Sequence, residues 1–241
     1  MKGIEGGILE TGQVFILNKP LYWTSFDLVN KARIIIRSIL GIKKIKVGHA
    51  GTLDPLATGL MIICTGKATK QIEEFRDLDK EYIATIHLGE TTPSYDLETE
   101  TDRSYPTGHI NESLVKEVLN RFLGQQEQIP PLYSAKFIDG KRAYEFARRG
   151  IEKELKPVTV VFREIELMKY DLPEIKVRLL CSKGTYIRAF ARDLGEALNS
   201  GGYLSALERT AVGTYRISDA WEVEKFREYI EQLRSTYVSE T

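Results

Sequence analysis

The chain has 241 residues, 42% of them hydrophobic and 28% charged, which is the composition of an ordinary globular protein long enough to bury a core. Its 34 basic and 34 acidic residues give a net charge of zero, which counts mildly against nucleic-acid binding, because nucleic-acid binders are usually basic. No apolar run could span a bilayer and the N-terminus carries no secretory pattern, so a cytoplasmic protein with no membrane partner is expected.

The hydrophobic patterns, and the glycines and prolines that interrupt them, predict strands and helices in turn along the chain. The predicted strands are Val14–Leu17, Lys44–Val47, Leu60–Cys64, Tyr82–Leu88, Tyr133–Ile138, Val158–Tyr170, Glu174–Cys181 and Thr214–Ile217. The predicted helices are one between Thr24 and Gly41, then Lys67–Phe75, Asn111–Phe122, a short one at Ala143–Arg149, Thr185–Leu198, Leu204–Leu207 and a final one at Val223–Leu233.

Local signals support several of these elements. Asp27 follows Thr24 by three residues, as in a capping box, and Gly41 suits the end of the same helix. The turn 171–173 between two long strands predicts an antiparallel hairpin. Strands grouped in pairs with helices between them predict an α+β fold rather than a strictly alternating parallel sheet.

The cysteines and histidines give no sign of a metal site. Cys64 and Cys181 lie in apolar runs and form no Cys-x-x-Cys pair, so both are expected to be buried structural thiols. The three histidines are scattered, without the spacing of a zinc site. We therefore expect neither a metal nor a cofactor.

Charge is unevenly distributed along the chain. Residues 28–53 contain six basic side chains and no acidic one, and residues 136–149 form a second basic run. Acidic residues gather between residues 73 and 102. A single charge run is best explained as a solvated face, but two basic runs flanking a motif-rich region favour a surface that follows phosphate groups.

The most informative segment is the loop 48–59. It holds three glycines, one proline and a single carboxylate, Asp54. Pro55 favours an extended backbone at Asp54, and Gly51 and Gly59 permit positive φ angles or close approach of other groups. The loop could therefore hold one carboxylate in a fixed orientation against a substrate. A plain turn aspartate is the alternative, and the Walker spacing of a phosphate-binding loop is absent.

The run from Gly48 to Pro55, followed by Ala57-Thr58-Gly59, closely resembles the active-site signature of the TruB family of pseudouridine synthases. Further segments match the same family in the same order: Leu17-Asn18-Lys19-Pro20 with Thr24-Ser25, Lys80-Glu81-Tyr82, Thr91 to Asp96, Pro130 to Ala135, Tyr144 to Gly150, and Cys181 to Arg188. The resemblance covers most of the chain.

The resemblance implies the family's catalytic fold, with a central, mainly antiparallel mixed sheet flanked by helices and an RNA-binding cleft. We expect one catalytic domain over residues 1–241, with 219–241 forming a C-terminal helix and tail. Many relatives carry a small C-terminal RNA-binding domain of the PUA type. Only about twenty residues follow Trp221 here, so no separate domain of this type is expected.

The resemblance also implies the reaction, which is isomerisation of uridine to pseudouridine at position 55 in the T-arm loop of tRNA. The target base would be flipped out of the RNA, with Asp54 as the nucleophile. Tyr82 would stack on the uracil, and Arg188 would pair with Asp54 and keep it charged. Taken alone, Tyr82 would be a core aromatic and Arg188 an exposed helix residue.

Other family positions imply substrate contacts. His49 would fill the space vacated by the flipped base, and Tyr186 and Leu207 would line the uracil pocket. Three residues are candidates for phosphate contacts: Lys19, Lys183 and Arg209. Without the resemblance, packing roles and exposed solubilising side chains would be favoured for these residues. Glu208 departs from the basic sequence expected beside Arg209.

The expected partner is tRNA, with no obligate protein partner and a monomeric enzyme. Two other functions stay open. The chain could be the catalytic subunit of a guide-RNA pseudouridylation particle, although such enzymes rely on the extra C-terminal domain. It could instead be an RNA-folding or binding module without catalysis, against which the intact set of Asp54, Tyr82 and Arg188 argues.

Overall fold

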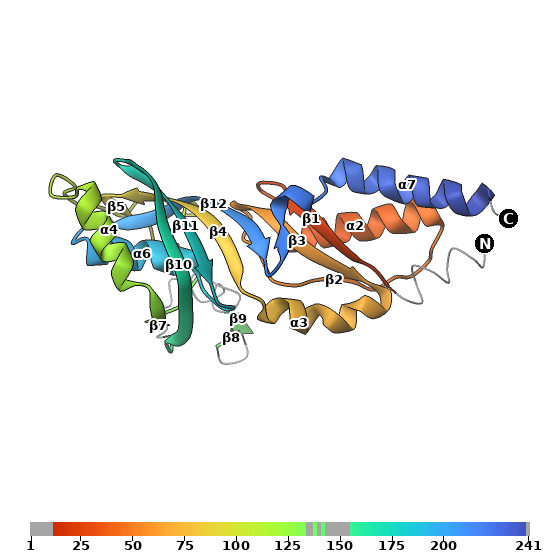
Figure 1. The fold of residues 1–241 in the computed structure, drawn as a ribbon, viewed down its shortest axis with the longest axis horizontal. Coiled ribbons are helices and arrows are strands. Elements are labelled where there is room, and N and C mark those ends of the chain that lie inside the picture. Colours follow the sequence, from red (N-terminus) through yellow and green to blue (C-terminus); the bar gives the residue numbers. More distant parts are fainter. Residues whose placement is uncertain (1–11, 134–136, 139–140, 143–154, 240–241) are drawn as a thin grey trace. The chain divides into compact units, whose positions relative to one another are not determined.

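The computed structural model describes residues 12–133, 137–138, 141–142 and 155–239, and it consists of two compact units (Figure 1). The first unit comprises Met1–Lys80 with Glu208–Thr241, and the second comprises Glu81–Leu207. Two strands, β4 (Lys80–Leu88) and β12 (Gly202–Val212), carry the chain from one unit to the other.

The first unit is built around β3 (Ala57–Thr65), which is buried along nearly its whole length. Its antiparallel partner β1 (Val14–Lys19) pairs Val14 with Cys64 and Lys19 with Gly59, and the later part of β12 lies on its other side. The short strands β2 (Val47–His49) and β13 (Tyr215–Arg216) pair with β3 and β12. Because the loop 50–56 joins β2 to β3, this sheet fixes both of its ends.

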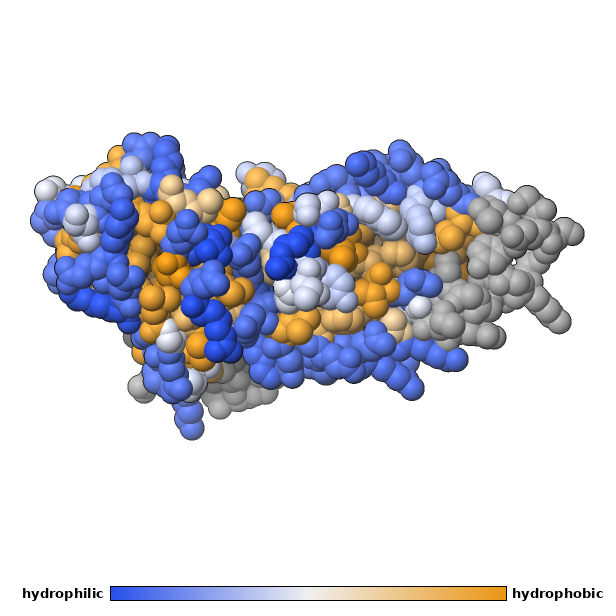
Figure 2. Space-filling model, viewed as in Figure 1, coloured by the Kyte–Doolittle hydropathy of each residue, from blue (hydrophilic) through white to orange (hydrophobic). Residues whose placement is uncertain are grey.

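Helices cover this sheet. Helix α2 (Ser25–Leu40) begins with the predicted capping box of Thr24 and Asp27, and ends at Gly41 with a left-handed φ of 69°. Helix α7 (Val223–Ser239) packs beside α2 and against β1 (Figure 1). The described residues of this unit also form three short helices: η2 (Gly66–Gln71), α3 (Ile72–Asp77) and η3 (Ile217–Asp219). Hydrophilic residues cover the outer sides of α3 and α7 (Figure 2).

The second unit continues with strands in the order β12, β4, β11 (Glu174–Cys181), β10 (Val158–Asp171) and β7 (Gly124–Gln128). Strands β10 and β11 form an antiparallel hairpin, as predicted. Two small strand pairs lie outside this sheet: β5 (Glu90–Thr91) with β6 (Arg103–Ser104), and β8 (Phe137–Ile138) with β9 (Lys141–Arg142).

Helices α4 (Glu112–Arg121) and α6 (Ile187–Ala197) pack together in the second unit, and α4 also packs against β10. The ring of Phe190 on α6 lies 5.2 Å from that of Phe122 and 5.1 Å from that of Phe162. Most of α6 between Ile187 and Gly195 is buried. The start of this helix, which carries several predicted site residues, is therefore held by a packed aromatic core.

The predicted α+β architecture with a mainly antiparallel sheet is confirmed, and so is the burial of both cysteines. The helix predicted at 204–207 is wrong, because these residues lie within strand β12. Their apolar spacing suggests a helix, but the Ser205 hydroxyl donates to the carbonyl of Thr85 on β4, a long-range contact that the local pattern cannot reveal.

Smaller differences concern boundaries. The region predicted as one helix at 67–75 divides into η2 and α3, and the strand predicted at 44–47 begins only at Val47. The helix predicted at 143–149 lies outside the described residues, and so do residues 134–136 of the strand predicted at 133–138. Among the residues described, no helix is long and apolar enough to cross a membrane.

Candidate active site

The loop that carries Asp54 is fastened to the start of α2. The hydroxyl of Ser25 accepts a hydrogen bond from the Leu53 amide at 2.8 Å and donates one to the Leu53 carbonyl at 2.9 Å. Both residues are 4% exposed, so water does not replace these bonds. Beyond Leu53, the amide of Ala57 donates to the Asp54 carbonyl and closes a turn. The backbone on either side of Asp54 is thereby fixed, while Asp54 itself stays partly exposed.

Two glycines allow the loop to take this path. Gly51 has a φ of 100° and Gly59 a φ of 111°, both in the region that favours glycine, as the sequence predicted. A β-carbon on Gly59 would lie 2.4 Å from the carbonyl oxygen of Arg209 and 2.6 Å from its amide nitrogen. Since both atoms belong to the backbone of β12, they cannot move aside without a cost in folding free energy.

Arg209 supports the loop from within. Its side chain is almost completely buried, with the residue 1% exposed. The guanidinium donates from Nε to the Leu60 carbonyl at 2.8 Å and from Nη2 to the Gly51 carbonyl at 3.2 Å. Charged donors of this kind make strong hydrogen bonds. Arg209 therefore ties the two ends of the loop together.

Lys19 is a second buried cation close to the Asp54 loop. The residue is fully buried, and its Nζ donates to the carbonyls of Trp23 at 2.6 Å and Pro20 at 3.0 Å. Burial lowers the pKa of Lys19 to about 8, while the carboxylate of Asp54 opposes this shift and Arg209 adds to it. Below about pH 8, Lys19 therefore carries a positive charge near Asp54.

His49, at the end of β2, lies in the same unit and is partly buried. Burial lowers the pKa of the His49 imidazole, and the positive charges of Arg76 and Arg209 lower it further. A hydrogen bond with the Gly51 backbone raises the pKa, but the net shift is downward. The histidine is therefore neutral at physiological pH.

In the second unit, Tyr82 and Arg188 are both buried, at 8% and 5% exposure. Tyr82 lies on the buried face of β4, and Arg188 lies in the first turn of α6. The Arg188 Nε lies 3.6 Å from the Asp96 carboxylate, and its Nη1 donates to the Ser94 carbonyl at 3.3 Å. Asp96 is itself 4% exposed, so this ion pair is buried and holds the guanidinium in place.

The start of α6 is also held by Gln128, the last residue of β7. The Gln128 side-chain oxygen accepts from the Tyr186 amide at 2.8 Å, and its Nε2 donates to the Tyr186 carbonyl at 3.1 Å. Gln128 is 3% exposed. One amide therefore satisfies both backbone groups of the residue that caps α6, and this fixes the chain two residues before Arg188.

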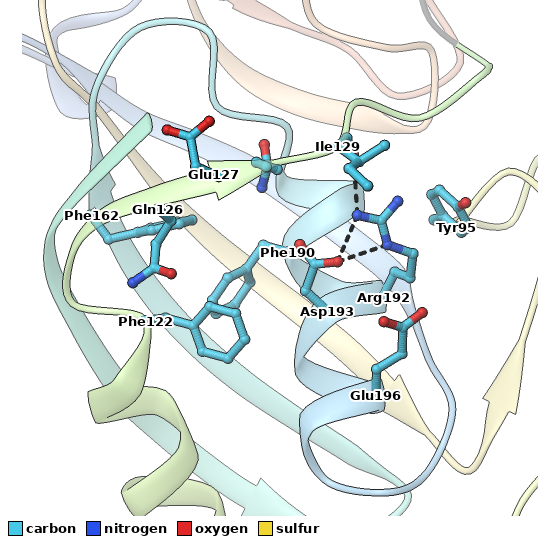
Figure 3. Close-up of a pocket in the computed structure, with 11 residues that line it drawn as sticks. Tyr95, Phe122, Gln126, Glu127, Ile129, Phe162, Phe190, Arg192, Asp193 and Glu196 are labelled. Carbon is cyan, nitrogen blue, oxygen red and sulfur yellow. Dashed lines mark hydrogen bonds and ion pairs between the residues drawn. The ribbon is translucent and has the colours of Figure 1, made fainter. Parts of the chain in front are cut away.

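Beside this contact lies a pocket of about 480 Å³, shown in Figure 3. Arg192, one turn beyond Arg188, pairs with Asp193 at 2.6 Å and donates to the Ile129 carbonyl at 3.1 Å (Figure 3). Its guanidinium also lies 4.8 Å from the centre of the Tyr95 ring. Helix α6 thus anchors both the 92–96 loop and the chain that leaves β7.

Other predicted positions in the second unit are less enclosed. Tyr186 and Leu207 are half-buried, and Lys183 is exposed in the turn before α6. Within the described part of the chain, no group of three or more histidine, cysteine or acidic side chains could hold a metal ion.

Comparison with known proteins identifies the family. The N-terminal domain of the TruB family of pseudouridylate synthases matches residues 37–187. The chain belongs to the TruB family. Proteins named tRNA pseudouridine synthase B from Phocaeicola vulgatus and Parabacteroides distasonis are 62% and 59% identical to it, each over 92% of this chain and 94% of the relative.

A solved structure described as a Cbf5-Nop10-Gar1 complex also resembles this TruB-family chain. It aligns with a TM-score of 0.70 and 27% identity, and the alignment covers 94% of this chain and 56% of the other.

Within this TruB-family chain, the first unit contains Lys19, His49, Asp54 and Arg209, and the second contains Tyr82, Lys183, Tyr186, Arg188 and Leu207. The predicted pairing of Arg188 with Asp54 stays a prediction, because the ion pair described above is made with Asp96.

The phosphate contacts predicted for Lys19 and Arg209 stay predictions. Both side chains are buried and bonded to backbone carbonyls around the Asp54 loop, which gives them a supporting position there. The sequence alone cannot show which way a long side chain points.

Three supporting residues were missed: Ser25, Asp96 and Gln128. Ser25 and Asp96 lie inside segments that resemble the family, so the resemblance contained the signal. A polar loop is usually exposed, which is why the buried Asp96 was not singled out. Nothing in the local sequence distinguishes Gln128 from its neighbours Gln125 and Gln126.

Proposed function

We propose that this protein isomerises a uridine of tRNA to pseudouridine, at position 55 in the T-arm loop, with Asp54 as the catalytic nucleophile. The observation that carries the proposal is the rigid fastening of the Asp54 loop by Ser25 and Arg209, in a chain 62% identical to a named tRNA pseudouridine synthase B. A carboxylate held this firmly can be aimed at one atom of a bound nucleotide.

The reaction breaks the bond between N1 of uracil and C1′ of ribose and forms one between C5 and C1′. The proton on C5 is lost and N1 gains one, so atoms and electrons balance without an oxidant or a cofactor. Asp54 must be ionised to act at the ribose. The positive charge of Lys19 lies near Asp54, and the predicted approach of Arg188 would bring a second cation to it.

The target base must leave its stack to reach Asp54. Tyr82 would stack on the flipped uracil, and Tyr186 and Leu207 would line its pocket. Neutral His49 would occupy the space that the base vacates, since an uncharged ring can be inserted among bases at low desolvation cost.

Lys183 keeps its proposed role as a phosphate contact, because its side chain is exposed in the turn before α6, where an RNA backbone can approach it. Lys19 and Arg209 would act indirectly instead, by supporting the Asp54 loop. We further propose that the enzyme acts in the cytoplasm as a monomer on free tRNA, without an obligate protein partner or cofactor.

A guided enzyme is the main alternative, since one structural relative is described in complex with Nop10 and Gar1. The tRNA enzyme is favoured because the bacterial relatives are far more similar, and 94% of their length is matched. An RNA-binding module without catalysis is the second alternative.

The deciding experiment is pseudouridine mapping on an unmodified tRNA transcript, with wild-type protein and with Asp54→Asn, in the absence of guide RNA and other proteins. Conversion at a single T-loop uridine by the wild type alone supports the proposal. Conversion that depends on added guide RNA would favour the guided enzyme. RNA binding by both proteins without conversion would favour the binding module.

A further inference from the structure

Two exposed aromatic side chains lie beside the Asp54 loop, where α2 begins. Tyr22 is 74% exposed and Phe26 is 65% exposed, which is unusual for large aromatic residues. The amide of Tyr22 donates to the Pro55 carbonyl at 2.8 Å, so Tyr22 is attached directly to the residue that follows Asp54. Both rings are thus presented to solvent close to the nucleophile.

The backbone of Tyr22 is strained. Its φ of 66° lies in the left-handed region, where glycine or asparagine is far more common than a bulky residue. Because the side chain is mostly exposed, packing gives little energy in return for this strain. Unfavourable backbone geometry that packing does not explain is a typical feature of functional positions.

The surface that continues from these rings is cationic. The only acidic residue on α2, Asp27, accepts hydrogen bonds from the Thr24 amide and hydroxyl, and so serves as a helix cap. Four basic residues beyond it are exposed: Arg37, Lys43, Lys44 and Lys46. The neighbouring helix α7 carries both signs of charge, so the cationic surface is bounded on that side.

A groove of about 390 Å³ lies along the first half of α2, lined by Trp23, Asp27, Asn30, Lys31 and Ile34. Exposed aromatic rings with cations around them are what unpaired nucleotides bind, because every base can stack and every linkage carries a phosphate. Leu21 and Ile34 extend the exposed apolar surface here, at 44% and 51% exposure, but the cationic residues that continue from it favour a polyanion over an apolar protein surface.

We propose that Tyr22 and Phe26 stack on unpaired bases of the tRNA substrate, while the basic residues from Arg37 to Lys46 bind its phosphates. This inference rests on the proposed function, because it takes RNA as the ligand of the neighbouring loop. It assigns part of the RNA affinity to the start of α2, a surface that none of the predicted site residues includes.

The test compares Tyr22→Gly, Phe26→Ser and the double variant with the wild type. Tyr22→Gly removes the ring and also relieves the strained backbone, so its melting temperature should be equal to or above that of the wild type. Met168→Ser, at a 49% exposed apolar position on β10, is the matched control. Binding of unmodified tRNA transcript is measured by fluorescence anisotropy over a range of salt concentrations, and KM and kcat are measured by pseudouridine formation.

The expected result is a loss of tRNA affinity of about fivefold or more for each ring, seen in Kd and KM, with an unchanged dependence on salt. Replacing Lys43 and Lys44 by glutamine should instead reduce the salt slope by roughly one unit per lost phosphate contact. Unchanged tRNA affinity in the double variant, with Met168→Ser as reference, would overturn the inference.

A second result would also overturn the inference, and light scattering tests for it. This result is that the wild type is a dimer and the Tyr22 and Phe26 variants are monomers, because the two rings would then form a dimer interface. The anisotropy measurement separates this inference from the proposed function. If the wild type binds tRNA but forms no pseudouridine, the proposed reaction fails, and the relative affinities of the variants still decide whether the rings bind RNA.

Discussion

Replacing Ser25 by alanine tests whether one buried hydroxyl holds the catalytic loop. In the wild type this hydroxyl satisfies both the amide and the carbonyl of Leu53. Alanine fits the same space but leaves both backbone groups buried without a partner from this side chain. Because Leu53 immediately precedes Asp54, the variant should lose both stability and correct placement of the nucleophile.

The magnitude follows from the two bonds. An unsatisfied buried donor or acceptor costs roughly 1–3 kcal/mol, so the loss of both bonds should lower the free energy of unfolding by about 2–6 kcal/mol. A shift of the carboxylate by even a fraction of an ångström lowers the rate, and we expect kcat to drop by roughly tenfold or more.

Urea unfolding followed by circular dichroism measures the stability, and single-turnover pseudouridine formation measures the catalytic step. Ser38→Ala is the matched control on the same helix, because Ser38 is exposed and its hydroxyl donates only to the Ile35 carbonyl at 3.2 Å. Its free energy of unfolding should change by less than about 0.5 kcal/mol. If Ser25→Ala behaves like this control in both assays, the loop is not held in the way we describe.

Three further predictions concern the same framework. Gly59→Ala should destabilise the protein by roughly 2–4 kcal/mol, measured by urea unfolding, because the new β-carbon meets the Arg209 backbone at a positive φ. Gln128→Ala should lower kcat/KM by about tenfold while the far-ultraviolet spectrum stays unchanged, since the backbone of Tyr186 loses both of its hydrogen bonds to this side chain. In a pH profile, kcat/KM should fall as the pH rises through about 8, where Lys19 loses its charge, and Lys19→Met should be less active throughout and lack this step.

Each of these has its own contradicting result. A Gly59→Ala protein as stable as the wild type would mean that β12 moves aside without cost. Gln125→Ala, on the exposed part of β7, is the control for Gln128→Ala, and equal activities of the two would remove the positioning role. A flat wild-type profile between about pH 7 and 9.5 would show that the Lys19 charge does not assist the nucleophile.

The sequence by itself determined the family and most of the local structure, and it predicted Asp54 as the nucleophile. Capping at Thr24, the left-handed end at Gly41 and the hairpin around residues 171–173 depend on interactions within a few residues, so the local pattern reveals them. The positive φ angles of Gly51 and Gly59 were predictable for the same reason.

Only the tertiary structure decided which polar side chains are buried and what they hold. Arg209 contacts Gly51 across 158 positions of sequence, and Gln128 contacts Tyr186 across 58. Such contacts depend on how strands from distant parts of the chain come together. Residues 204–207 show the same dependence on distant contacts. Their local pattern favours a helix, but pairing with β4 stabilises them as a strand. The same local sequence is compatible with a lysine or arginine that supports a loop and with one that contacts a phosphate. The direction of the side chain is fixed only when the sheet has formed.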